Sequence, residues 1–427
     1  ASFAPMEGMG LIVVDEEHDS ALKQEDHLRY NARDLAIMRG KIAGATVILG
    51  SATPSLETFY NAQMGRFKHI QLPERASGRP MPSVEVIDRS KSGHTDSSLS
   101  PQLMRAMDET LAAGGQVMLL LNRRGFSSFL ICSSCGHVPQ CPNCSVSLTN
   151  YQKSRKLKCH YCNHVEQVHE QCTQCAASPI LPGTLGTESL EEEIKALFPD
   201  RTVLRVDRES MERKGALEAA LASIASGESE IVIGTQIIAK GHDFPNIALV
   251  GVVNADSSFH LPDFRASEKS FQLFTQMAGR AGRGTKPGRV LLQTYNPRHP
   301  SIEHSCRHDY RGFSEEEMQV RHAFKYPPFS RMTRIIISAP DSALAEATAE
   351  RLTKELHRIS DPKLLEIVGP APAVLAKVQN RYRWNIILKC TKAGPLHKAV
   401  QTMLELSQEW IDRRVMLQVD VDPVSLM

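Results

Sequence analysis

The sequence predicts an α/β protein whose layers of strands and helices are interrupted by a cysteine-rich module and followed by a small α+β domain. Short apolar runs alternate with helical stretches as far as residue 317, which favours parallel sheets. Eight of the ten cysteines form four Cys-x-x-Cys pairs inside residues 132–175. Residues 318–427 follow a β-α-β-β-α-β order. A length of 427 residues also indicates more than one domain.

The first layer covers residues 1–72. Its expected elements are the strands Leu11–Val14 and Thr46–Leu49 and the helices Ala32–Ile42 and Pro54–Met64. The sequence starts without an initiator Met or a signal-peptide pattern and enters a strand almost at once, so we expect it to begin inside a domain. Residues 75–100 are rich in Pro, Gly and Ser, which predicts a connector to another domain.

The second layer is expected in residues 73–131 and 176–317, on either side of the cysteine segment 132–175. Its predicted strands are Val117–Leu121, Thr202–Val206, Ile231–Ile233, Leu249–Val253 and Arg289–Thr294. Its predicted helices are Gln102–Ala112, Leu190–Leu197, Lys214–Ser223 and Phe271–Gln276. The α+β domain, 318–427, follows a polar helix near Glu315–His322 and is expected to contain Thr333–Ser338, Ala343–His357, Leu365–Val368, Trp384–Lys389, His397–Trp410 and Met416–Val421.

Composition narrows the class of protein. Apolar residues make up 41% and charged residues 23% of the chain, as in ordinary globular proteins. No apolar run is long enough to span a bilayer. The net charge is only +2, so binding to nucleic acid would have to rest on local basic surfaces.

An acidic tetrad, Asp15-Glu16-Glu17-His18, directly follows the first strand. One carboxylate at such a strand end can hold a Mg²⁺-bound water, and the next can position or deprotonate the water that attacks a γ-phosphate. A solvated acidic strand end is the alternative for the tetrad taken alone.

Three further fragments lie at strand or helix ends. Gly50-Ser51-Ala52-Thr53-Pro54 follows the second strand, and Gly234-Thr235-Gln236 with Lys240-Gly241-His242-Asp243 follows Ile231–Ile233. Gln276, Gly279, Arg280 and Arg283 lie where a helix ends. Guanidinium groups at such a point can reach across a cleft and neutralise charge in a transition state. Each fragment alone is also explained by a structural turn.

In this order and spacing the fragments resemble the motifs of superfamily 2 helicases, in which two RecA-like lobes clamp ATP between them. The closer resemblance is to the primosomal protein N′ (PriA) family of replication-restart helicases, and it runs over essentially the whole chain. The strings that carry it are Asp15–Ser20, Lys23-Gln24, Arg29–Asp34, Leu121–Gly125, Leu185–Glu188, Asp207-Arg208, Lys214–Leu217, Pro262–Arg265 and Asp420–Pro423.

The resemblance implies a role for each motif residue. Asp15 would be the Mg²⁺-side carboxylate and Glu16 the catalytic one, while His18 and Gln276 would couple the nucleotide state to DNA. Asp243 would meet the nucleotide, and Arg280 and Arg283 would face its phosphates. The residues expected to contact DNA are Thr235, Gln236 and Lys240.

The same resemblance implies a function and its partners. We expect a cytoplasmic, ATP- and Mg²⁺-dependent 3′-to-5′ DNA helicase that remodels stalled forks and D-loops to restart replication. The implied partners are branched and single-stranded DNA, the single-stranded DNA-binding protein, and the primosome proteins that lead to the replicative helicase. The implied fold is a partial first RecA-like helicase lobe, a second lobe interrupted by the cysteine module, and the C-terminal domain.

The sequence also departs from the family pattern. No Gly-x-x-x-x-Gly-Lys-[Ser/Thr] loop occurs in these residues, so we expect this chain alone to hydrolyse no ATP. The alternative function is therefore a non-catalytic scaffold that binds DNA structures; a translocase of another pathway is a third, against which the inserted cysteine module argues. Leu22 stands where relatives usually carry an aromatic residue, and Asn254 replaces an acid that is common in relatives.

The cysteine pairs predict zinc. They are Cys132/Cys135, Cys141/Cys144, Cys159/Cys162 and Cys172/Cys175. Two residues between thiolates form a knuckle that places both sulfurs on one tetrahedral ion, and two knuckles complete the site. Spacing alone permits a nested or an interleaved pairing of the knuckles, or eight free or disulfide-bonded cysteines. The nested scheme, with the middle two pairs on one ion, matches the family and implies two structural Zn²⁺ ions.

Several nearby residues allow two interpretations. His137, His160, His164 and His169 are expected at the surface rather than as ligands, and Cys306 and Cys390 are expected to be buried. The cluster Lys153, Arg155, Lys156 and Lys158 fits either a DNA backbone contact or a solvated loop. Arg381-Tyr382-Arg383-Trp384 fits either stacking on unpaired bases or a strand with Trp384 in the core.

Overall fold

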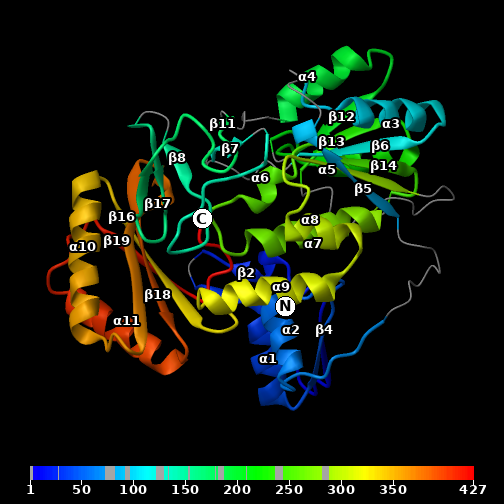
Figure 1. The fold of residues 1–427 in the computed structure, drawn as a ribbon. Helices are drawn as coiled ribbons and strands as arrows, with labels where there is room; N and C mark the ends of the chain where they lie inside the picture. The colour runs from blue at the N-terminus through cyan, green and yellow to red at the C-terminus, as the bar shows by residue number, and fades with distance from the viewer. Residues whose placement is uncertain are drawn as a thin grey trace. The chain divides into compact units, whose positions relative to one another are not determined.

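The computed structural model describes residues 3–26, 28–72, 82–91, 97–121, 129–132, 134–151, 154–177, 179–180, 187–207, 209–235, 244–280 and 288–427. It divides into two compact units (Figure 1). Unit 1 consists of residues 1–71, 160–163 and 318–427, and unit 2 consists of 72–159 and 164–317. Of the four predicted segments, 1–72 and 318–427 lie almost entirely in unit 1. The other two, the second layer and the cysteine segment, lie almost entirely in unit 2.

Unit 2 contains a six-stranded parallel sheet in the order β12-β13-β6-β14-β15-β5. The strands are β5 (Ser83–Asp88), β6 (Gln116–Leu120), β12 (Val203–Val206), β13 (Ile231–Gly234), β14 (Ile247–Val252) and β15 (Arg289–Thr294). The helices are α3 (Pro101–Ala112), α4 (Thr187–Leu197), α5 (Ala216–Ser226), α6 (Asp256–Phe259), α7 (Ala266–Arg280) and α8 (Pro300–Cys306). The predicted alternation of strands and helices is confirmed.

Helices cover both faces of this sheet, because its central strands carry apolar side chains on both faces. Met118 and Leu120 of β6 point to one side and pack with α5, α7 and α8. Val117 and Leu119 point to the other side and pack with α3 and α4. Continuous apolar strands of this kind are typical of a parallel sheet buried on both faces.

The prediction that residues 75–100 form only a connector was wrong, because a strand lies within them. Residues Ser83–Asp88 form β5, which pairs in parallel with β15 at the edge of the sheet. Val84 and Val86 pack on one face of the sheet and Ile87 on the other. The strand is short and lies between Pro-, Gly- and Ser-rich stretches, which hid its alternation of polar and apolar residues.

The N-terminal part of unit 1 is a two-stranded parallel sheet, β1 (Leu11–Val14) with β4 (Thr46–Leu49). Two helices accompany it, α1 (Ala32–Ala43) and α2 (Leu56–Gln63), together with the hairpin β2 (Lys23–Gln24) and β3 (Tyr30–Asn31). Gly40 allows α1 to lie close to β4, because a Cβ at this position would collide with Val47 Cγ2. The four elements predicted here are confirmed.

The C-terminal part of unit 1 is an antiparallel sheet in the order β17-β18-β16-β19. The elements are β16 (Arg331–Ala339), α10 (Ser342–Ile359), β17 (Leu365–Val378), β18 (Arg381–Cys390), α11 (Ala393–Ser407) and β19 (Met416–Val421), in the predicted β-α-β-β-α-β order. One face packs against α10 and α11 through residues such as Ile335, Ile337 and Ile386 (Figure 1). The opposite face carries polar residues, among them Arg334, Asn385 and Gln418.

The remaining elements are short strands of the cysteine module and one helix. The module contains β7 (Ile131–Cys132), β8 (Thr149–Tyr151), β9 (Lys156–Lys158), β10 (Val165–Gln167) and β11 (Pro179–Ile180). β8, β9 and β10 form a small antiparallel sheet, and β7 pairs with β11. The helix α9 (Tyr310–Ala323) confirms the predicted polar helix. Among the described residues, none of the helices has both the length and the apolar character that crossing a bilayer requires.

Candidate motor site and metal clusters

The acidic tetrad begins immediately after β1. Asp15 and Glu16 are exposed, and the backbone N–H of Glu16 donates to Asp15 Oδ1 at 2.9 Å. Glu16 has φ +47°, a left-handed conformation that is uncommon for a residue with a side chain. The two carboxylates that were predicted to serve a metal ion and a water molecule are therefore accessible from solvent.

The tetrad is joined to the fragment after β4. Because β1 and β4 are parallel and adjacent, with Val14 opposite Leu49, both fragments leave the same end of the sheet. His18 Nδ1 lies 2.7 Å from Ser51 Oγ, which also accepts the backbone N–H of Thr53 at 2.9 Å. The fold thus brings these two motifs together.

Glu17 is the residue of the tetrad to which the sequence assigned no role. Its side chain is buried and hydrogen-bonded to Ser55 and Thr58, and it forms an ion pair with Arg33. Two signals were available: Arg33 lies in one of the strings shared with the family, and Ser55 has the side chain expected at a helix N-cap. Neither signal indicates which distant carboxylate the two residues share.

The other motor residues lie in unit 2. Thr235 directly follows β13, and Gln276 lies in α7 with its side chain half-buried. Arg280 is the last residue of α7, but its side chain lies outside the described part of the chain. The predictions for Gln236, Lys240, Asp243 and Arg283 also fall outside the described residues. The roles of these residues therefore stay predictions.

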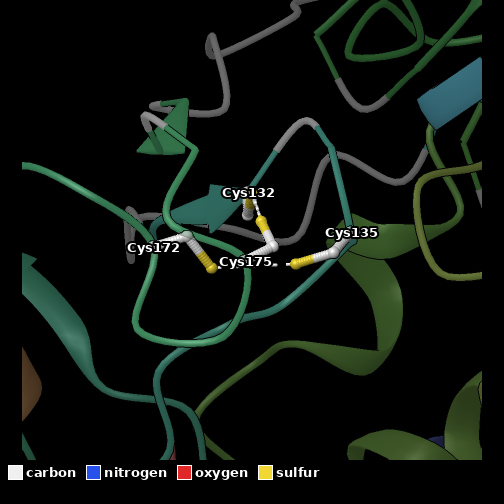
Figure 2. Close-up of side chains that lie close together, drawn as sticks. All are labelled: Cys132, Cys135, Cys172 and Cys175. Carbon is white, nitrogen blue, oxygen red and sulfur yellow. Dashed lines mark hydrogen bonds between the residues drawn. The ribbon is translucent and has the colours of Figure 1, made fainter.

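The first metal cluster consists of Cys132, Cys135, Cys172 and Cys175 (Figure 2). The sulfurs of Cys132 and Cys175 are 3.5 Å apart, and those of Cys135 and Cys172 are 3.7 Å apart. A disulfide needs about 2.05 Å between sulfurs, whereas Zn–S bonds of about 2.3 Å in a tetrahedron place sulfurs roughly 3.8 Å apart. The four thiols therefore fit a zinc ion.

The second cluster consists of Cys141, Cys144, Cys159 and Cys162, whose sulfurs lie within 4.8 Å of one another. Together the two clusters match the nested pairing: the middle knuckles share one site and the outer knuckles share the other. The described residues give no such group that mixes Cys132 with Cys141, as the interleaved pairing would require.

All four knuckles have the same backbone turn. The residue after the second cysteine has positive φ in each case: Gly136 at +71°, Ser145 at +50°, Asn163 at +61° and Ala176 at +59°. Three of these residues carry a side chain, which disfavours the left-handed conformation. The repeated turn indicates that the geometry of the ligand pair sets the local backbone, and Gly136 is further required because a Cβ there would collide with Tyr295 O.

The thiols of the first cluster differ in their tendency to ionise. Burial raises the pKa of Cys135 to about 12. Burial also opposes ionisation of Cys172, but hydrogen bonds from the backbone of Gln174 and Cys175 outweigh it and lower the pKa of Cys172 to about 7. Since zinc binds thiolates, the ion would have to displace a proton from Cys135 at neutral pH.

Four smaller predictions can be compared with the structure. The expectation of a surface position was wrong for His160, which is buried and whose Nδ1 lies 2.9 Å from Pro372 O; neither four-cysteine group includes a histidine. Cys390 is buried as expected, but Cys306 is only half-buried. Trp384 lies in the core of the C-terminal sheet, as the second of its two interpretations expected. Lys158 lies over the ring of Tyr151, and Lys153 is outside the described residues.

Comparison with known proteins gives three family matches. The helicase conserved C-terminal domain matches residues 185–285, the PriA DNA helicase Cys-rich region domain matches 141–166, and the primosomal protein N C-terminal domain matches 322–424. A solved structure of RecG bound to a three-way DNA junction is 13% identical to this chain, and the match covers 73% of this chain and 30% of that chain with a TM-score of 0.37.

 

Relatives match this chain over its whole length, and two of them show the degree of similarity. They are the replication restart proteins PriA of Bacillus subtilis (strain 168) and of Haemophilus influenzae, each 41% identical to it. The chain spans 53% of the first relative and 58% of the second, which is little more than half of their length.

The parallel sheet, the inserted cysteine clusters and the small C-terminal domain together define a helicase lobe that carries a cysteine-rich region. The chain is similar from end to end to replication restart proteins PriA, and two of its three family matches are domains of that family.

Proposed function

We propose that the chain is part of the motor of an ATP-dependent 3′-to-5′ DNA helicase that remodels stalled forks and D-loops to restart replication. The observation that supports this proposal is that the residues of the acidic tetrad differ in exposure and in contacts. Asp15 and Glu16 stay exposed at the strand end, where Glu16 Oε2 lies 3.5 Å from His18 Nδ1, whereas Glu17 is buried and paired with Arg33. Only the first two acids are available for a metal ion and a water molecule.

The roles of the individual residues follow from this proposal. Asp15 would hold Mg²⁺ with ATP, Glu16 would position the attacking water, and His18 would report the nucleotide state through Ser51. In unit 2, Asp243, Gln276, Arg280 and Arg283 would act on the nucleotide. Thr235, Gln236 and Lys240 would contact the DNA strand.

Two zinc ions are part of the proposal, one in each four-cysteine cluster. Sites with four thiolates and no open position support a fold and do not perform chemistry. The partners we propose are branched and single-stranded DNA, the single-stranded DNA-binding protein and the primosome proteins. A cytoplasmic location fits the eight thiols, because a reducing compartment keeps them available for metal.

The test uses the complete gene product that contains these residues. It should hydrolyse ATP faster when forked DNA is added, and Glu16→Gln should keep ATP binding but lose roughly 10²–10⁴-fold in turnover, because an amide cannot act as a base. We expect the 427-residue chain alone to bind forked DNA without hydrolysing ATP. A complete gene product that binds forks but hydrolyses no ATP would favour the scaffold instead.

A further inference from the structure

The third acid of the tetrad differs from its two neighbours in its surroundings. Glu17 is only 2% exposed, whereas Asp15 and Glu16 are open to solvent. A buried carboxylate requires hydrogen bonds or an opposite charge to offset the loss of water. Glu17 has both, and each of its partners comes from a different place in the chain.

Both carboxylate oxygens of Glu17 accept hydrogen bonds. Oε1 accepts the backbone N–H of Ser55 at 2.6 Å. Oε2 accepts the hydroxyls of Ser55 at 3.1 Å and Thr58 at 2.9 Å, and it forms an ion pair with Arg33 Nη1 at 3.1 Å. The backbone N–H of Glu17 donates to Gly50 O at 3.0 Å. Glu17 is therefore held through its side chain and its backbone.

These partners connect Glu17 to three elements of unit 1. Ser55 is the N-cap of α2 and Thr58 lies in its first turn, so the carboxylate sits at the positive end of that helix. Arg33 lies in the first turn of α1, and Gly50 follows β4. Burial opposes the charge of Arg33, but the neighbouring carboxylates of Asp34, Glu17 and Glu57 outweigh it and raise the pKa of its guanidinium above the ordinary value. The guanidinium of Arg33 is thus charged at neutral pH.

The contacts of Glu17 bear on Glu16 because the two residues are adjacent. Glu16 has a left-handed backbone, φ +47°, which a residue with a side chain keeps only when its surroundings impose it. On one side, Asp15 Oδ1 accepts the N–H of Glu16; on the other side, Glu17 is fixed to α1, α2 and Gly50. Release of Glu17 would free the backbone of Glu16 to relax.

We propose that Glu17 is a positioning residue, which holds Glu16 in the orientation that hydrolysis requires by tying the strand-end turn to the starts of α1 and α2. This inference rests on the proposed function. It assigns to the third acid of the tetrad a task that differs from those of the first two. Glu17 itself does not touch the nucleotide.

The test is Glu17→Gln in the complete gene product. The amide keeps the shape of the side chain but loses the charge that pairs with Arg33, and it replaces one of the two accepting oxygens with an NH2 group, which donates. We expect DNA-stimulated kcat for ATP to fall by up to about 10²-fold, as when a reacting group is misplaced by an ångström. KM for ATP should stay close to that of the wild type, because the residues that would contact ATP are unchanged.

A matched control is Asp34→Asn. Asp34 also pairs with Arg33, at 2.8 Å, but its side chain is 52% exposed and it does not contact Glu17. This control removes a carboxylate from the same guanidinium, and its kcat should remain near that of the wild type. A loss of kcat in Asp34→Asn equal to the loss in Glu17→Gln would overturn the proposal, since the effect would then come from Arg33 alone.

A second variant covers the case in which Glu17→Gln does not fold. Thr58→Val removes one hydroxyl that donates to Glu17 and keeps the volume of the side chain. It should lower kcat several-fold, with KM unchanged. If either folded variant loses thermal stability but keeps wild-type kcat, Glu17 is only structural and the inference is wrong. If the wild type itself hydrolyses no ATP, the proposed function is what fails.

Discussion

Two parallel sheets in this protein both contain strongly apolar strands, but these strands are buried to different degrees. In unit 2, Leu119 of β6 is fully buried, because neighbouring strands and helices enclose it. In unit 1, Leu11 of β1 is 54% exposed and Val13 is 60% exposed. In this chain, which spans little more than half the length of its relatives, α1 and α2 leave these side chains of β1 uncovered. The comparison shows that an apolar pattern can predict a strand correctly without predicting how deeply its side chains are buried.

The exposed sheet nevertheless builds a defined site at its end. The bond of His18 to Ser51 and the network around Glu17 are both formed in unit 1. Polar contacts at the strand ends therefore do not depend on the burial of the strand faces. The following predictions use this contrast between contacts that fix local geometry and packing that supplies stability.

The largest effect is expected in the cysteine module, whose geometry depends on metal rather than on an extensive core. Removal of zinc with a chelator should unfold residues 132–175 while the six-stranded sheet persists, because the binding energy of a structural zinc ion is also folding energy. Hydrogen–deuterium exchange would reveal this order, and metal analysis should give two zinc ions per chain. One ion or none, or Cys132 and Cys141 on the same ion, would contradict the prediction.

The next effect concerns catalysis by unit 2. Arg283→Ala in the complete gene product should abolish DNA-stimulated ATP hydrolysis and unwinding, since an arginine that stabilises the transferring phosphoryl group is worth roughly 10³–10⁵-fold. Binding to forked DNA should stay near that of the wild type. Arg283→Lys should restore little activity, because an ammonium cannot reproduce the planar guanidinium. An arginine that only caps a helix would cost stability and leave turnover near normal, which ATPase assays and a melting curve would distinguish.

A matched pair of leucines tests the contrast between the two sheets directly. Leu119→Ala should lower the free energy of unfolding of unit 2 by about 2–5 kcal/mol, because it leaves a cavity in a closed core. Leu11→Ala should change the stability of unit 1 by no more than about 0.5 kcal/mol, as for other exposed positions. Chemical denaturation of both variants measures the difference. Equal losses would mean that β1 is buried in solution.

Much of this fold was predictable from local patterns. Except for β5, the strands of both parallel sheets follow from runs of apolar residues, as does the order of the C-terminal domain. The cysteine spacing narrowed the metal pairing to a few schemes. Residues whose surroundings come from distant segments were not predictable. Lys23 and Asp420 form an ion pair at 2.8 Å, with only 3% and 8% of their side chains exposed, although nearly the whole chain separates them. The burial of His160 and Glu17 has the same origin, since no local pattern encodes the segment that covers them.

The smallest expected effect is a dependence of the stability of unit 2 on pH. Burial lowers the pKa of His299 in unit 2 from its ordinary value of 6.5 to about 3. Its ring stacks on Phe259 with centroids 4.0 Å apart, and its Nδ1 accepts the backbone N–H of Ser301 at the start of α8. The folded state therefore keeps this histidine neutral, and protonation would convert the accepting nitrogen into a donor.

The direction of the pH effect follows from linkage. Below pH 6.5 the unfolded chain takes up a proton at His299 that the folded chain does not, so stability falls as the pH decreases towards 3. From pH 6.5 to pH 5 the loss should be about 2 kcal/mol at most. Asp256 acts in the opposite direction, because burial raises its pKa to about 6 and the folded state keeps its proton longer. The pH dependence of stability in the wild type alone would therefore understate the contribution of His299.

The measurement is the difference between the wild type and His299→Asn in the free energy of unfolding of unit 2, followed from pH 7.5 to pH 5. Asparagine can still accept the N–H of Ser301 but does not titrate, so the variant should lose less stability on acidification than the wild type does. Asp256→Asn should have the reverse effect and make the loss steeper. Parallel curves for the wild type and His299→Asn would show that His299 is already accessible to protons in the folded state, and that its burial in unit 2 is not maintained in solution.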